Sequence, residues 1–221
     1  GMEEFHEERQ ENRSEFQRDY DRLIFSAPFR RLQNKTQVFP LPGSVFVHNR
    51  LTHSLEVASV GRSLGDDVAK ALLERHPELQ DSFLPEIGSI VSAACLAHDL
   101  GNPPFGHSGE KAISTFFSEG KGVRLKEKQP NGEQLSPMEW EDLIHFEGNA
   151  NAFRILTHQF EGRRKGGFVL TYTTLASIVK YPFSSSLAGT KSKFGFFVSE
   201  EESFRKIATE LGLILLNEHP L

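Results

Sequence analysis

The feature that most constrains this chain is an apolar helical stretch that runs directly into a cluster of chemically active side chains within residues 90–110. Apolar residues recur at helical spacing from Ile87 to Ala94, and the same stripe continued by four residues reaches His98. Asp99 follows directly, and at a helix end both side chains can reach one ion. Imidazole plus carboxylate without a thiolate suits a divalent metal such as Mn, Fe, Mg or Zn. The alternative is a capped, buried His–Asp pair.

A second histidine extends this pattern on an earlier predicted helix, Leu51 to about Arg75. Its predicted inward stripe is Val57, Val60/Gly61, Leu64, Val68 and Leu72, and four residues before Val57 it reaches His53. Two buried imidazoles and a carboxylate between antiparallel helices need a compensating charge or hydrogen bonds, and a metal would supply the charge. Arg50 lies about one turn before His53, close enough to touch a metal-bound anion. A surface salt bridge is the alternative for Arg50.

A histidine and a glutamate stand three residues apart at the start of the next predicted helix, His107 and Glu110. This spacing puts the imidazole and the carboxylate on one helix face within reach of each other. A carboxylate that bonds a histidine orients it and raises its basicity, as a general acid or base requires. The alternative is a carboxylate stabilised by the dipole at the helix start.

The composition is that of an ordinary globular protein of one or two domains, with 221 residues and a formal net charge of −5. Nothing global indicates a nucleic-acid or membrane surface, although Arg30, Arg31 and Lys35 could face a phosphate or another subunit. The one cysteine excludes a disulfide within the chain. With no signal peptide and no apolar run of about 18 residues, we expect a cytoplasmic protein that does not engage membranes.

Nearly every element reads as a helix, which predicts an all-α fold. Residues 1–26 read as a polar, partly solvated helical arm, and residues 118–135 as a mobile loop. Ser136 opens a capping box, and Thr171–Lys180 is a further helix. Residues 183–198 show no strong period and are interpreted as a loop or a short hairpin.

One histidine on a helix and a His–Asp dipeptide on a later one make up the first three quarters of the H…HD…D signature of the HD superfamily of metal-dependent phosphohydrolases. Longer strings closely resemble the deoxyguanosine triphosphate triphosphohydrolases (dGTPases) and related dNTPases. The matches run in order from about residue 19 to residue 182. They are RLQNKTQVFPL from Arg31, RLTHSLEV from Arg50, AHDLGNPPFGHSGE from Ala97, FEGNA from Phe146, and LTYTTL from Leu170 with KYP from Lys180.

The resemblance implies an HD-domain helical bundle that cleaves dGTP or another dNTP. In that family water attacks the α-phosphorus, and the bond to the nucleoside 5′-oxygen breaks, giving deoxynucleoside and intact triphosphate. The implied cofactor is a divalent metal, Mn, Mg or Fe. The resemblance assigns metal ligation to His53, His98 and Asp99, and catalysis to His107 and Glu110.

The same resemblance implies four substrate contacts and several partners. Phosphate contacts fall on Arg50 and Lys180, a pocket wall on Tyr181, and a contact to the deoxynucleoside on Gln37. It also implies a role in nucleotide metabolism and a homo-oligomer, with possible control by a nucleotide effector or single-stranded DNA.

One departure from the family concerns the fourth metal ligand, an aspartate on a later helix. No convincing candidate precedes residue 221, and Asp142 lies in a segment that does not match. We therefore expect residues 27–221 to be an HD domain truncated before its last ligand helix, the N-terminal part of a larger helical protein. The alternatives are another HD-type nucleotidase or phosphodiesterase, and a regulator that binds nucleotide or single-stranded DNA without turnover.

Overall fold

The computed structural model describes residues 13–35, 49–130, 132–161, 167–188, 193–213, 215–216 and 219–220. Within them the fold is all-α, as predicted, apart from one pair of two-residue antiparallel strands, β1 and β2. The α-helices are α1 Glu15–Ile24, α2 Ala27–Arg31, α3 Arg50–Arg75, α4 Ile87–Ala97, α5 His107–Ser118, α6 Pro137–Ile144, α7 Gly148–Thr157, α8 Tyr172–Ile178 and α9 Glu201–Glu210. Short 3-10 turns are η1 Leu32–Asn34, η2 Pro77–Leu79, η3 Leu84–Glu86, η4 Lys121–Lys126, η5 Ser185–Leu187 and η6 Val198–Glu200. The strands are β1 Leu215–Leu216 and β2 His219–Pro220.

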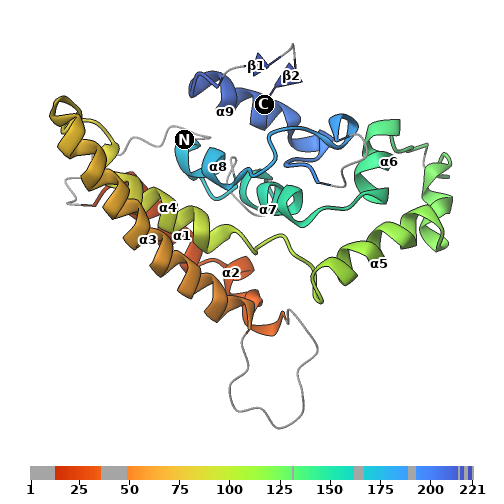
Figure 1. Cartoon of the computed structure of the whole chain (residues 1–221). Helices are drawn as coiled ribbons and strands as arrows, with labels where there is room; N and C mark the ends of the chain where they lie inside the picture. The colour runs from red at the N-terminus through yellow and green to blue at the C-terminus, as the bar shows by residue number, and fades with distance from the viewer. Residues whose placement is uncertain are drawn as a thin grey trace, which may run out of the picture.

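Helices α3 and α4 lie side by side and form the longest packed pair of the molecule (Figure 1). The predicted inward stripe of α3 is wrong at Val60, Leu64 and Val68, which are 60%, 60% and 50% exposed, whereas its member Gly61 is buried. The buried face of α3 instead carries small side chains after its first residue: Arg50, Ser54, Ala58, Gly61, Gly65 and Ala69. These residues also recur every three or four positions, and hydropathy alone ranks them below valine and leucine. Small residues form the buried face here because they let the backbones of α3 and α4 approach each other closely.

Gly65 marks the closest approach, since a Cβ added there would lie 2.8 Å from the Cα of Gly88 on α4. We therefore expect Gly65→Val to lower the free energy of unfolding by about 1–3 kcal/mol through overpacking. Leu64→Ala, at the exposed neighbouring position, should change it by less than about 0.5 kcal/mol. Urea unfolding of both variants tests this, and a larger loss for Leu64→Ala would contradict the observed orientation of α3.

The hydrophobic core gathers around α4. Helix α1 contributes Leu23, α7 contributes Phe153 and Leu156, and α9 contributes Phe204, all at most 1% exposed. The boundary at residue 26 between an arm and a domain stays a prediction, although α1 places Leu23 in this shared core. None of the described helices combines the length and the apolar character needed to cross a membrane.

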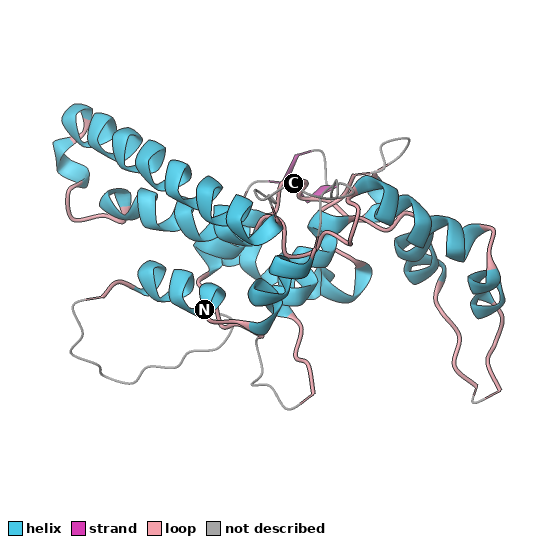
Figure 2. Ribbon diagram, turned by 90° about the horizontal axis from the view of Figure 1, so that it is seen from below, coloured by secondary structure: helices cyan, strands magenta, loops and turns pink. Residues whose placement is uncertain are grey.

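Helix α7 lies in the middle of the molecule, between the α3–α4 pair on one side and α5 with α6 on the other (Figure 1). Seen from below, helices α3 and α4 project to one side and α5 lies toward the other (Figure 2). Residues 118–135, predicted as a loop, contain the 3-10 turn η4. The predicted capping box at Ser136 is confirmed, with Ser136 and Glu139 bonding each other's backbone N–H.

Candidate metal and catalytic site

Three predicted metal ligands come together where α3 begins and α4 ends. One ligand atom from each of His53, His98 and Asp99 lies within 4.8 Å of the other two. His53 comes from the first turn of α3, and His98 is the residue that ends α4. Both imidazoles are half-buried, whereas Asp99 is buried. The sequence-based prediction that these side chains converge therefore agrees with the structure.

The ring of His98 is oriented by its own helix. Its Nδ1 lies 2.6 Å from the carbonyl oxygen of Cys95. A carbonyl can only accept, so Nδ1 carries a proton, and Nε2 is the nitrogen left to bind a metal. That Nε2 lies 3.5 Å from Oδ1 of Asp99. Two ligands about 2.1 Å from one tetrahedral ion are separated by about 3.4 Å, so the pair has the spacing that a metal requires.

Asp99 is held by an arginine from the neighbouring helix. Nη1 of Arg50 donates to Oδ2 of Asp99 at 2.8 Å, and both side chains are buried. Nδ2 of Asn102 donates to the other oxygen, Oδ1, at 2.5 Å. The alternative of a surface salt bridge for Arg50 is thus wrong: the ion pair is buried, and it places a positive charge next to the candidate metal ligands.

The residues present fit a divalent metal. Two imidazoles and one carboxylate form a donor set typical of such ions, and the bond from His98 to a carbonyl is the usual support of a metal-binding histidine. The buried Nε of Arg50 has no hydrogen-bond partner among the described residues. An anion bound at the metal could accept from this N–H, and the phosphate contact of Arg50 stays a prediction.

Metal binding should be measurable without turnover. We expect Mn²⁺ at about 100 times its dissociation constant to stabilise the protein by about 2.7 kcal/mol, since an ion that binds only the folded state shifts unfolding. Thermal unfolding with and without Mn²⁺ measures this shift. His98→Ala should lose most of it. His76→Ala, which alters an exposed histidine at the far end of α3, should keep it.

The predicted catalytic pair forms at the first turn of α5. Nδ1 of His107 lies 2.7 Å from Oε2 of Glu110, and the His107 side chain is 85% exposed whereas that of Glu110 is 12% exposed. Burial would raise the pKa of Glu110, but hydrogen bonds from His107 and from the Gly148 N–H, with the charge of Lys193, lower it overall. An ionised Glu110 only accepts, so His107 keeps a proton on Nδ1 and presents Nε2 to solvent.

Two glycines bring the metal group and the catalytic pair into one region. Gly101 packs so tightly on α7 that a Cβ there would lie 2.0 Å from the Gly148 carbonyl oxygen. A Cβ on Gly148 would in turn lie 2.1 Å from Oδ1 of Asn102. The Gly148 N–H donates to Glu110 at 2.9 Å. Asn102 and Gly148 therefore link Asp99 to Glu110 by direct contacts.

Lys193 also belongs to this region and was not predicted from the sequence. Its Nζ lies 2.7 Å from Oε1 of Glu147 and 3.6 Å from Oε2 of Glu110. These bonds and charges outweigh burial, which alone would lower the pKa of Lys193, and raise that pKa. The signal was weak because residues 183–198 have no clear period. The aromatic run after Lys193 was the available clue, since Phe194 and Phe196 are buried and anchor this segment.

The remaining predicted substrate contacts are Lys180, Tyr181 and Gln37. The Nζ of Lys180 lies 5.5 Å from the ring centroid of Tyr181, just after α8. Gly195 packs against the Tyr181 carbonyl oxygen, so this stretch adjoins the segment that carries Lys193. Among the described residues, the ring contacts of Tyr181 are with Lys180 and Phe183, and neither Lys180 nor Tyr181 belongs to the metal group. Gln37 lies outside the described residues.

Asp142, predicted to be a poor substitute for the fourth ligand, has other bonding partners. Its two carboxylate oxygens accept from the Ser185 hydroxyl at 2.6 Å and from the Val198 N–H at 2.7 Å. It therefore joins α6 to the 183–198 segment, and the described residues that group for a metal do not include it.

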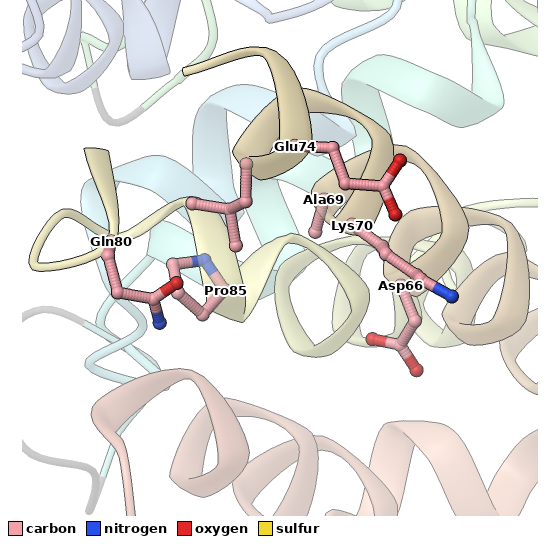
Figure 3. Close-up of a pocket in the computed structure, with 7 residues that line it drawn as sticks. Asp66, Ala69, Lys70, Glu74, Gln80 and Pro85 are labelled. Atoms are coloured by element: carbon pink, nitrogen blue, oxygen red, sulfur yellow. The ribbon is translucent and has the colours of Figure 1, made fainter. Parts of the chain in front are cut away.

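Two hollows in the described part of the chain lie outside the metal group. One, of about 490 Å³, is lined by Asp66, Ala69, Lys70 and Glu74 of α3 and by Gln80 and Pro85 of the following turns (Figure 3). Asp66 lies 13 residues after His53, about 20 Å further along α3. The other, of about 690 Å³, includes Lys35, whose pKa is lowered by burial and by the charge of Arg50. Lys35 also donates to the Leu100 carbonyl at 3.2 Å.

Comparison with known families finds one match. Residues 50–165 match the model of the HD domain, and they contain the metal group and the catalytic pair. The chain therefore belongs to the HD domain family.

Its similarity to individual proteins is more specific. It is 46% identical over 217 residues to a deoxyguanosinetriphosphate triphosphohydrolase-like protein of Synechocystis, covering 94% of this chain and 48% of that protein. It is 47% identical over 222 residues to a protein of the same name from Pseudomonas aeruginosa, covering 95% and 47%. A deoxyguanosinetriphosphate triphosphohydrolase of Yersinia enterocolitica is 36% identical over 239 residues, covering 93% and 45%. The predicted resemblance is confirmed. The chain spans about half the length of these relatives, whose names support a phosphohydrolase, and hence a hydrolase.

Proposed function

We propose that the protein is a metal-dependent dNTP triphosphohydrolase that cleaves dGTP or another dNTP into deoxynucleoside and triphosphate. The observation that carries the proposal is the exposed imidazole of His107, which is bonded to the buried Glu110 and linked through Asn102 and Gly148 to the His53–His98–Asp99 group. A proton-transfer pair beside a metal-binding group can supply the acid–base catalysis and the charge stabilisation that phosphoester hydrolysis requires. The names of the relatives favour dGTP as the substrate.

The proposed roles follow from the positions of the side chains. A divalent metal held by His53, His98 and Asp99 would polarise a phosphoryl oxygen. Arg50 offsets phosphate charge with its Nε–H, which has no hydrogen-bond partner in the described part of the chain. Water adds to the α-phosphorus and releases a proton to solvent, while protonated His107 donates from Nε2 to the departing 5′-oxygen. The bond between the α-phosphorus and that oxygen breaks.

The other assignments complete the proposal. Lys180 contacts the triphosphate, Tyr181 forms a pocket wall and Gln37 contacts the deoxynucleoside. Mn, Mg or Fe is the metal, and the fourth ligand is an aspartate on a later helix. The protein acts in nucleotide metabolism as a cytoplasmic homo-oligomer that responds to a nucleotide effector or single-stranded DNA.

Product analysis tests the proposal. The natural full-length protein is incubated with each of the four dNTPs and Mn²⁺ or Mg²⁺, and the products are separated by ion-exchange chromatography. Deoxynucleoside plus intact triphosphate is the expected outcome, and the fastest dNTP identifies the preferred base. Free phosphate or dNMP would indicate a different HD-type nucleotidase or phosphodiesterase. Binding without any product would indicate a regulator.

A further inference from the structure

Three charged side chains from three separate segments meet behind His107. Glu110 comes from α5, Glu147 is the residue that caps α7, and Lys193 comes from the segment before α9. The carboxylates of Glu110 and Glu147 are 12% and 1% exposed, and the Lys193 side chain is 31% exposed. Among the described residues, Lys193 is the lysine or arginine within ion-pair distance of both carboxylates.

Each carboxylate has a separate task besides its bond to Lys193. Glu147 accepts from the backbone N–H groups of Asn149 and Ala150, which fixes the start of α7. Glu110 accepts from the Gly148 N–H at the same helix start and from His107. Both carboxylates are therefore held around one helix terminus. A cation within reach of both offsets the like charges of these two carboxylates.

The position of Lys193 is set by the core rather than by solvent. Phe194 and Phe196 are 0% and 2% exposed. Gly195 lies between them in close contact with the Tyr181 carbonyl. A short segment with two buried aromatic rings gives the lysine a defined place. Its Nζ lies 3.6 Å from Oε2 of Glu110, the same oxygen that accepts from His107.

We infer that Lys193 is a positioning residue for catalysis: it holds Glu110 as an oriented carboxylate, so that His107 keeps its proton on Nδ1 and presents Nε2 to the substrate. The inference rests on the proposed function of His107 and Glu110. Lys193 acts through Glu110 and contributes no atom to the reaction. The geometry assigns it a role although it is remote in sequence from α5.

The test compares Lys193→Met and Lys193→Arg in the natural full-length protein loaded with Mn²⁺. We expect Lys193→Met to lower kcat by about 10- to 100-fold with KM nearly unchanged, the usual effect of losing a group that orients a working side chain. Without the cation the pKa of Glu110 rises, so the acidic limb of the pH–rate profile should move to higher pH. Lys193→Arg, which keeps the charge, should restore most of kcat and the original profile. Lys206→Met, at an exposed position on α9, is the control and should match the wild type.

Four results would overturn the inference. A raised KM with unchanged kcat would make Lys193 a direct substrate contact. An unmoved pH profile, or Lys193→Arg no better than Lys193→Met, would leave it a structural residue. If the wild type cleaves no dNTP, the proposed function fails, and ¹⁵N-histidine NMR decides the inference without turnover. Lys193→Met should then show less of the Nδ1-protonated tautomer of His107 than the wild type, and equal amounts would contradict the inference.

Discussion

Asp99→Ala is expected to abolish metal binding and to lower the free energy of unfolding of the metal-free protein by about 3–5 kcal/mol. Asp99 is the carboxylate that the buried guanidinium of Arg50 bonds at 2.8 Å. Removing it leaves a positive charge out of water without that partner, which costs more than the ion pair itself contributes. Urea unfolding in the presence of EDTA measures the effect on folding, and calorimetric titration with Mn²⁺ measures the effect on binding.

The double variant Arg50→Met with Asp99→Ala separates the two effects. If the loss of stability comes from the unpaired guanidinium, removing it as well should recover a large part of that loss. Metal binding should stay absent, because its ligand is still missing. Asp81→Ala, at an exposed position in the turn after α3, is the control and should change the free energy of unfolding by less than about 0.5 kcal/mol. Full additivity of the two single changes would contradict the coupling of Arg50 and Asp99.

The metal group was predictable because its signals are local. His98 and Asp99 are adjacent, and His53 lies in the first turn of a helix that the sequence marks clearly. The start and the end of a helix depend on neighbouring residues, so the sequence indicates at which helix ends these side chains lie. The capping box at Ser136 was predictable for the same reason. By contrast, which face of α3 is buried depends on the shape of α4, and there small size outweighed hydropathy.

Contacts between distant segments were not predictable. Arg50 was expected near a bound anion, but its buried bond to Asp99 depends on how α3 and α4 pack together. Lys193 contacts Glu147 and Glu110, although it lies 46 and 83 residues after them in the chain. No short sequence motif predicts contacts over such separations. Its place follows from the burial of Phe194 and Phe196, a tertiary effect that periodicity does not report. The sequence thus indicated the acid–base pair, whereas the structure was needed to show what holds it.

His107→Ala is expected to lower kcat for dNTP cleavage by about 10²- to 10⁴-fold, the usual contribution of a general acid or base. Folding should be nearly unaffected, because the His107 side chain is 85% exposed. Glu110→Gln should lower kcat less, since the imidazole remains while its orientation weakens. Because the two residues act as a unit, the double variant should be little worse than His107→Ala alone. Single-turnover kinetics at saturating dNTP and Mn²⁺ measure the chemical step.

A matched control for His107 and Glu110 is the pair of His76 and Glu78 at the C-terminal end of α3. Nδ1 of His76 lies 3.2 Å from Oε1 of Glu78. This pair has the same chemical groups, but both side chains are more than half exposed and neither lies in the metal group. His76→Ala should therefore leave kcat and KM unchanged. A His107→Ala variant that kept the wild-type kcat would exclude His107 as the proton donor, since no other step of the proposed reaction uses its imidazole. A deficit confined to KM would instead make His107 a binding residue for the triphosphate.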